Sequence, residues 1–168
     1  MEEIFKIAIK EYGVKEIVGH RHNPRILDYF KKVHHSWVKT DELAWCASFV
    51  GFCIESAGYE STRALNARSY LKWGEFTLDP QVGDLVVFWR DSENSWKGHV
   101  GFYINETEDG YINVLGGNQN NQVCIQEYPK YKLLGYRRVK SDTVSVVKDT
   151  RTLAQKVNDL IISHFKNK

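Results

Sequence analysis

An apolar segment that begins at Trp45 constrains the fold of this chain more than any other feature. Its apolar side chains recur at steps of three and four residues, which is the spacing of a helix buried against the rest of a protein. They are Phe49, Val50, Phe52, Cys53, Ile54 and Ala57. Residues 40–42 supply the hydroxyl and acidic groups that often precede a helix, and Gly58 is a typical stop signal. The pattern predicts a largely buried helix with Cys46 in its first turn.

Cys46 would lie where unpaired backbone N–H groups and the helix dipole favour an anion. Such surroundings lower the pKa of a thiol and make it a better nucleophile. The alternative is that Cys46 fills the core, because free cysteine is one of the residue types most often buried. The helix alone does not decide between a nucleophile and a core residue.

The three cysteines, Cys46, Cys53 and Cys124, predict free thiols. No pair has the Cys-x-x-Cys spacing of zinc or redox motifs. Cys46 and Cys53 are seven positions apart on one predicted helix, too far for a disulfide unless the helix unwinds. His20 and His22 lie in a loop without acidic or thiol companions nearby, so we expect solvated side chains there. We therefore expect no metal and no cofactor.

The composition is that of an ordinary folded protein. The 168 residues are 42% hydrophobic and 26% charged, which suits one domain with a substantial core. A net charge of +2 gives no reason to expect a nucleic-acid partner. No stretch is long and apolar enough to predict a membrane span, and the N-terminus lacks the basic and apolar regions of a signal peptide. We expect synthesis in the cytoplasm without a signal peptide.

The order of the predicted elements indicates an α+β domain. Helical periodicity appears near residues 4–12, 24–30 and 66–74, in addition to the segment at Cys46. Apolar runs separated by turn residues then predict strands. These are Leu85–Trp89, Gly98–Ile104, Tyr111–Leu115, Gln122–Glu127 and Gly135–Val139. The order predicts N-terminal helices packed on an antiparallel β-meander, and we assign residues 1–140 to this domain.

Residues 141–168 are expected to form a separate basic extension. Residues 140–168 carry six Lys or Arg residues against three Asp residues. Apolar side chains in this part have the spacing of an amphipathic helix. The helix face consists of Leu153, Val157, Leu160, Ile161 and either His164 or Phe165. This extra C-terminal helix would be available to dock on the domain or to contact a partner.

A nucleophilic thiol needs a base, and the base needs a group that orients it. His99 is the candidate base, because it opens a predicted strand between Gly98 and Gly101, which allow a ligand to approach the imidazole closely. Asn118 follows the next strand, and antiparallel pairing can bring it to His99. Its amide oxygen would fix the imidazole tautomer in a Cys-His-Asn arrangement, with Gln119 as the nearest substitute. The alternative for Asn118 is a turn residue with a left-handed backbone.

Four motifs of this chain occur in the order seen in a known superfamily. They are Trp45–Val50, Val82–Phe88, Gly98–Phe102 and Val114–Gln119. The chain resembles the NlpC/P60 and CHAP superfamily of papain-like cell-wall peptidases and amidases over residues 3–139. With Asn23–Ile26 and Lys39–Glu42, it is most similar to a small CHAP-like subgroup found in bacteria and their phages.

The resemblance implies a papain-like fold and a set of catalytic roles. Cys46 corresponds to the nucleophile, His99 to the base and Asn118 to the orienting residue, a role that many relatives give to His or Glu. The resemblance implies an enzyme that cleaves an amide bond of peptidoglycan through a thioester intermediate. Peptidoglycan would then be the partner, reached by phage lysis or by specialised secretion, and the C-terminal helix could contact the wall. We also expect a monomer.

Aromatic and amide side chains near these motifs are candidate substrate contacts. We assign this role to Trp45, Trp73, Trp96 and Gln119. For Trp45 and Trp73, packing in the core is an equal alternative. Trp96 is the better candidate, because it lies in a polar loop just before His99.

Two other functions stay open at this point. The first is a cysteine hydrolase or acyltransferase that acts on a peptide outside the cell wall. The second is a catalytically silent wall-binding module. A silent module would have no need of Cys46, His99 and Asn118 together, so the sequence favours an enzyme.

Overall fold

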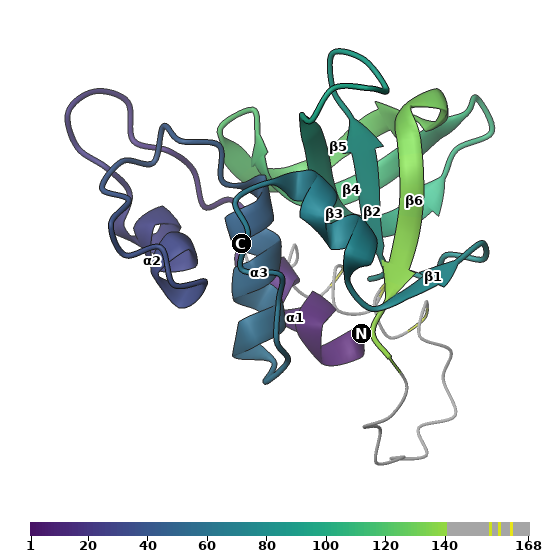
Figure 1. Cartoon of the computed structure of the whole chain (residues 1–168), viewed down its shortest axis with the longest axis horizontal. Coiled ribbons are helices and arrows are strands. Elements are labelled where there is room, and N and C mark those ends of the chain that lie inside the picture. The colour runs from purple at the N-terminus through teal and green to yellow at the C-terminus, as the bar shows by residue number, and fades with distance from the viewer. Residues whose placement is uncertain (141–154, 156–157, 159–161, 163–168) are drawn as a thin grey trace.

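The computed structural model describes residues 1–140 together with residues 155, 158 and 162 (Figure 1). The α-helices of this part are α1 (Glu2–Lys10), α2 (Pro24–Lys32) and α3 (Cys46–Ser56), and 3-10 helices form at η1 (Ala67–Lys72) and η2 (Lys130–Lys132). The strands are β1 (Glu75–Thr77), β2 (Leu85–Trp89), β3 (Gly98–Glu106), β4 (Tyr111–Gln119), β5 (Gln122–Pro129) and β6 (Leu133–Arg138). Helices followed by an antiparallel sheet confirm the predicted α+β class.

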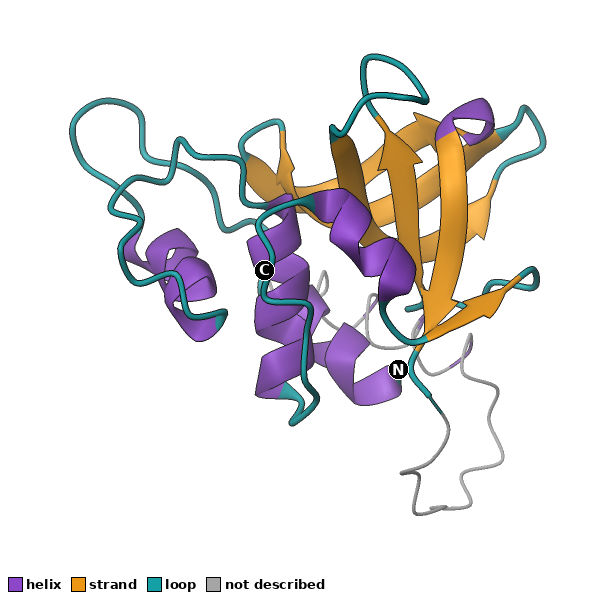
Figure 2. Cartoon of the chain, viewed as in Figure 1, coloured by secondary structure: helices purple, strands orange, loops and turns teal. Residues whose placement is uncertain are grey.

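The strands, drawn in orange in Figure 2, form one antiparallel sheet. Their order in the sheet is β1-β6-β2-β3-β4-β5. Strands β2 to β5 follow the predicted meander, whereas β6 crosses back to pair with β2. β2 has the predicted bounds, because a continuous apolar run with turn residues before it is an unambiguous pattern. β1 has no counterpart among the predicted strands, since an exposed strand of three residues carries too little pattern.

Helix α3 lies between the sheet and α2 (Figure 1). Every residue from Cys46 to Ile54 is buried, which explains why apolar side chains surround this helix instead of forming one stripe. Gly117 in β4 allows the sheet to approach it. A Cβ atom at this position would lie 2.6 Å from the Trp45 ring and 2.7 Å from Cβ of Phe49. The contact between β4 and α3 therefore requires glycine.

Asp41 holds the loop that precedes α2 and does not cap α3. Its buried carboxylate accepts hydrogen bonds from the backbone N–H groups of Ile17 at 3.1 Å and Asn23 at 2.8 Å, and it lies 2.8 Å from Nδ1 of His22. Burial disfavours the charged form, but these hydrogen bonds outweigh it and lower the pKa of Asp41. Because α3 begins after Trp45 without a side-chain cap, the predicted role of residues 40–42 is wrong. His22 is paired and not simply solvated.

The predicted amphipathic helix of the C-terminal extension, including Leu153, Val157 and Leu160, lies outside the described residues. Within the part that the structure describes, no helix has the length and apolar character needed to cross a membrane.

Candidate active site

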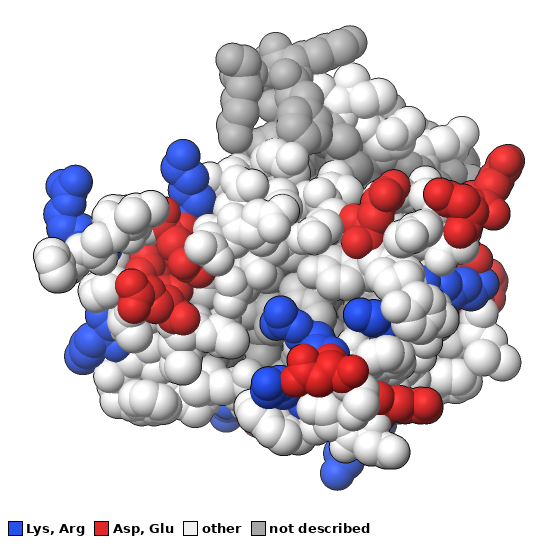
Figure 3. Space-filling view, turned by 90° about the horizontal axis from the view of Figure 1, so that it is seen from above, with Lys and Arg blue, Asp and Glu red and all other residues white. Residues whose placement is uncertain are grey.

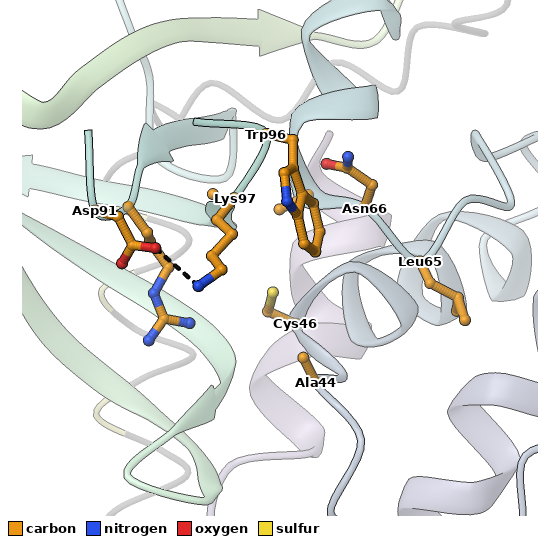
Figure 4. A pocket seen from close by; sticks show the side chains of 10 residues that line it. Ala44, Cys46, Leu65, Asn66, Asp91, Trp96 and Lys97 are labelled. Atoms are coloured by element: carbon orange, nitrogen blue, oxygen red, sulfur yellow. Dashed lines mark ion pairs between the residues drawn. The ribbon is translucent and has the colours of Figure 1, made fainter. Parts of the chain in front are cut away.

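Cys46 is the first residue of α3, and its sulfur faces the space between Trp96 and Lys97 (Figure 4). The residue is only 6% exposed. Burial raises the pKa of the thiol, although the backbone N–H groups of Val100 and Ala47 and the charge of Arg90 act in the opposite direction. The sequence-based expectation of a thiol with a lowered pKa is therefore wrong, because desolvation exceeds the effect of the helix N-terminus. At neutral pH Cys46 is a protonated thiol that needs a base.

His99 is the second residue of β3 and is 3% exposed. Its Nε2 atom lies 2.9 Å from Oε1 of Gln119. The amide nitrogen of Gln119 donates to the backbone carbonyls of Val114 at 3.2 Å and Cys124 at 2.6 Å, which fixes Oε1 as the atom that faces His99. Nε2 of His99 must then carry the proton, and Nδ1 keeps a free lone pair. This tautomer can accept a proton at Nδ1.

The orienting residue is Gln119 and not Asn118. Pairing between β4 and β5 shifts register between Gly116 and Gln119, and Asn118 takes a left-handed backbone with φ +56° in this bulge. The extra residues direct the Gln119 side chain into the interior, where it is 1% exposed. The expectation that Gln119 contacts substrate is therefore wrong as well. Asn118 has the left-handed backbone of the alternative interpretation, but it lies in a bulge of β4 and not in a turn.

Gly116 provides the space that the His99–Gln119 pair occupies. A Cβ atom on Gly116 would lie 2.5 Å from Oε1 of Gln119 and 3.2 Å from Nε2 of His99. The next residue, Gly117, meets the helix that carries Cys46. Two adjacent glycines of β4 thus make room on one strand: Gly116 for the His99–Gln119 pair, and Gly117 for the start of α3. The backbone N–H of Val100, next to His99, also acts on the Cys46 thiol.

Tyr128 of β5 is part of the site, although no sequence pattern singles it out. The His99 ring stacks on Tyr128 with 4.7 Å between ring centroids and 12° between planes, and Tyr128 stacks in turn on Phe88 at 4.9 Å. Burial is the main reason why the pKa of His99 falls to about 4, while the hydrogen bond to Gln119 opposes this and the charge of Arg90 adds to it. The imidazole is therefore neutral at pH 7.

A cavity of about 330 Å³ opens beside Cys46. The loop between β2 and β3 forms one side of it with Arg90, Asp91, Trp96 and Lys97, and the chain around the start of η1 forms another with Leu65, Asn66 and Ala67. Asp91 and Lys97 form an ion pair at 2.8 Å (Figure 4). Trp96 is 71% exposed, so its ring is accessible to a ligand.

The other two candidate tryptophans do not line this cavity. Trp45 is completely buried, and its indole N–H donates to Glu16 at 2.8 Å, so the expected substrate contact is wrong. The indole N–H of Trp73 donates to the backbone carbonyl of Glu60 at 2.9 Å, and the ring packs against the core. Both residues follow the packing alternative.

Arg68 of η1 holds the loop that carries Trp96. Its guanidinium donates to the backbone carbonyl of Ser95, and also to that of Glu93 at 2.7 Å. Gly98 allows this approach, because a Cβ atom there would lie 2.8 Å from Cγ of Arg68. The loop that borders the cavity is thus tied to the helix across from it.

Comparison with known proteins gives a family match over part of this chain. Residues 38–118 match the family model of the CHAP domain, a segment that contains both Cys46 and His99. The match supports the assignment of the chain to the CHAP/NlpC-P60 superfamily. The CHAP match ends one residue before Gln119, the residue that binds His99. The CHAP match supports a relationship to peptidoglycan-related hydrolases and amidases.

One solved structure similar to this CHAP protein is described as "similar to lipoprotein, NLP/P60 family", from Staphylococcus aureus subsp. aureus Mu50. The two chains are 19% identical with a TM-score of 0.49, and the similarity covers 84% of this chain and 41% of the other. The present chain therefore spans less than half of that protein. No curated protein sequence matches the chain. Among the described residues, no cluster of His, Cys, Asp and Glu has the arrangement of a metal site.

Proposed function

We propose that this CHAP protein is a cysteine-dependent hydrolase that cleaves an amide bond in peptidoglycan peptides. The observation that carries the proposal is the tautomer of His99. Its Nε2–H is committed to Gln119, so Nδ1 is the available proton acceptor. The backbone N–H of the next residue, Val100, acts on the Cys46 thiol, which lines the cavity. The match to the CHAP family model supports the wall peptide as the substrate class.

The first half of the reaction forms a thioester. Nδ1 of His99 takes the thiol proton of Cys46 while the sulfur attacks the scissile carbonyl carbon. The negative charge on the carbonyl oxygen is stabilised by backbone N–H groups at the start of α3, which have no acceptor within the helix. The C–N bond then breaks, and His99 passes its proton to the leaving amine.

The second half returns the enzyme to its starting state. A water molecule attacks the thioester carbon and gives up a proton to Nδ1 of His99. The C–S bond breaks, the carboxylic acid product leaves, and the proton returns to the Cys46 sulfur. Gln119 keeps the imidazole in one orientation throughout, and its amide oxygen accepts from the imidazolium that forms in each half.

Digestion of purified cell wall tests the proposal, with wild type beside Cys46→Ala, His99→Ala and Cys53→Ala. Cys53 is a buried cysteine of the same helix and serves as the matched control. We expect clearing by wild type and Cys53→Ala only, and released fragments with a new amine that mass spectrometry can locate. Equal clearing by Cys46→Ala would overturn the thiol mechanism. No clearing by the folded wild-type protein would overturn the wall substrate.

A further inference from the structure

The cavity beside Cys46 is lined by a cation that this mechanism does not use. Arg90 directly follows β2 and lines the same cavity as Cys46. Its side chain is exposed and makes no hydrogen bond or ion pair with any residue in the described part of the chain. Asp91, the acidic residue of the cavity lining, is bound to Lys97 at 2.8 Å. Among the charged residues that line the cavity, Arg90 is thus the one without a bound partner in the described part of the chain.

The position of Arg90 matters because its positive charge is close enough to act on both the Cys46 thiol and the His99 imidazole. It lowers the pKa of the Cys46 thiol and that of the His99 imidazole. It also acts on Asp91, but the contact with Lys97 dominates there. Seen from above, basic and acidic side chains gather around a hollow near the middle of the surface (Figure 3). The cavity lining as a whole carries two basic residues and one acidic residue.

We propose that Arg90 forms an anion subsite that binds a carboxylate of the substrate close to the scissile amide. A guanidinium presents two parallel N–H donors that match the two oxygens of a carboxylate. The inference rests on the proposed hydrolase function and narrows it. The substrate class is a wall peptide with a free carboxylate near the cleaved bond, and the same peptide with that group amidated is a poor substrate.

Alkylation of Cys46 tests the anion subsite without any substrate. The rates of labelling by iodoacetate, which is anionic, and by iodoacetamide, which is neutral, are measured at one pH, and mass spectrometry assigns the label to Cys46. The ratio of the two rates cancels changes in the thiolate fraction, so it reports the charge around the sulfur. In Arg90→Gln we expect this ratio to fall at least roughly fivefold.

Arg21→Gln is the matched control for alkylation, because Arg21 is an exposed arginine outside the cavity lining. It should leave the ratio unchanged. An equal ratio in wild type and Arg90→Gln would overturn the subsite, even if wild type digests cell wall. A ratio that depends on Arg90 in a protein without wall activity would support the anion subsite and reject only the wall substrate.

Modified cell wall tests the substrate class. Free carboxylates are converted to neutral amides with a carbodiimide and methylamine, and a glycan-cleaving lysozyme verifies that the modified wall is still accessible. We expect wild type to digest the neutral wall roughly tenfold more slowly than the native wall. Arg90→Gln should be slow on both walls, with a ratio near one. Equal digestion of both walls by wild type would overturn the carboxylate requirement.

Discussion

Nε2 of His99 lies 2.9 Å from Oε1 of Gln119, and both side chains are almost completely buried. This pair defines the tautomer of the proposed base. The amide group of Gln119 cannot rotate by half a turn without losing its two backbone acceptors. The orientation of the imidazole is therefore set by β4 and β5 and not by the substrate.

Replacement of Gln119 is expected to reduce kcat strongly. In Gln119→Ala, Nε2 of His99 loses its acceptor and the ring can adopt the wrong tautomer, so we expect a fall of roughly a hundredfold. Asn118→Gly is the control and should stay close to wild type, since Asn118 does not hold His99 and glycine tolerates the left-handed backbone. Wall-digestion kinetics measure both variants. A larger loss in the Asn118 variant would restore the sequence-based assignment.

Gly116→Ala is expected to damage the same pair by crowding. The new Cβ atom would lie 2.5 Å from Oε1 of Gln119, so the two side chains must separate. Overpacking of this kind costs about 1–3 kcal/mol of stability, which thermal unfolding measures. Activity should fall as far as in Gln119→Ala. The double variant should lose little more than either single variant, and additive losses would show that Gly116 acts elsewhere.

Tyr128 is expected to act through its ring and not through its hydroxyl. Tyr128→Phe keeps the ring that stacks on His99 and should retain nearly full kcat. Tyr128→Leu removes it, and a stacking contribution of about 0.5–1.5 kcal/mol predicts a loss of roughly two- to thirteenfold. Steady-state kinetics on wall fragments distinguish the two. Equal loss in both variants would indicate a role for the phenol.

The rate of the enzyme is expected to be insensitive to pH over a wide range. His99 has a pKa of about 4, and the pKa of Cys46 is raised, so the neutral pair is the main form at pH 6–9. We expect kcat/KM to rise with pH through about 4 and then to reach a plateau. Gln119→Glu places a carboxylate beside the imidazole and should move the acid limb to higher pH. A wild-type limb near pH 7 would contradict this ionisation state.

Stability should depend on pH through the same histidine. Its pKa is about 4 when folded, against an ordinary value of 6.5. The unfolded chain therefore takes up the proton first as pH falls below 6.5, and stability is lost between pH 6.5 and pH 4. When the pH is lowered from 7.5 to 4.5, the free energy of unfolding of wild type should fall by roughly 2–3 kcal/mol more than that of His99→Gln. Urea unfolding at each pH measures the difference. The same dependence of unfolding free energy on pH in both proteins would refute it.

Patterns within single segments were sufficient for much of the fold. The bounds of β2 follow from one apolar run, and α3 follows from its periodicity. The bulge before Gln119 could not be predicted, because the run Gly116–Gln119 looks like the turn that ends a strand while the structure continues pairing through it. Tyr128 and Arg90 could not be assigned either, since their roles depend on contacts between separate strands and loops.

The hydrogen bonds of Arg68 have a consequence for how ligands enter. One guanidinium spans the carbonyls of Glu93 and Ser95, so the stretch that bears Trp96 cannot swing outward by itself. Widening the entrance requires that η1 travel with it, or that both bonds break together. The size of the molecules that reach the Cys46 sulfur therefore depends on the position of η1, some 25 residues away from this loop in sequence.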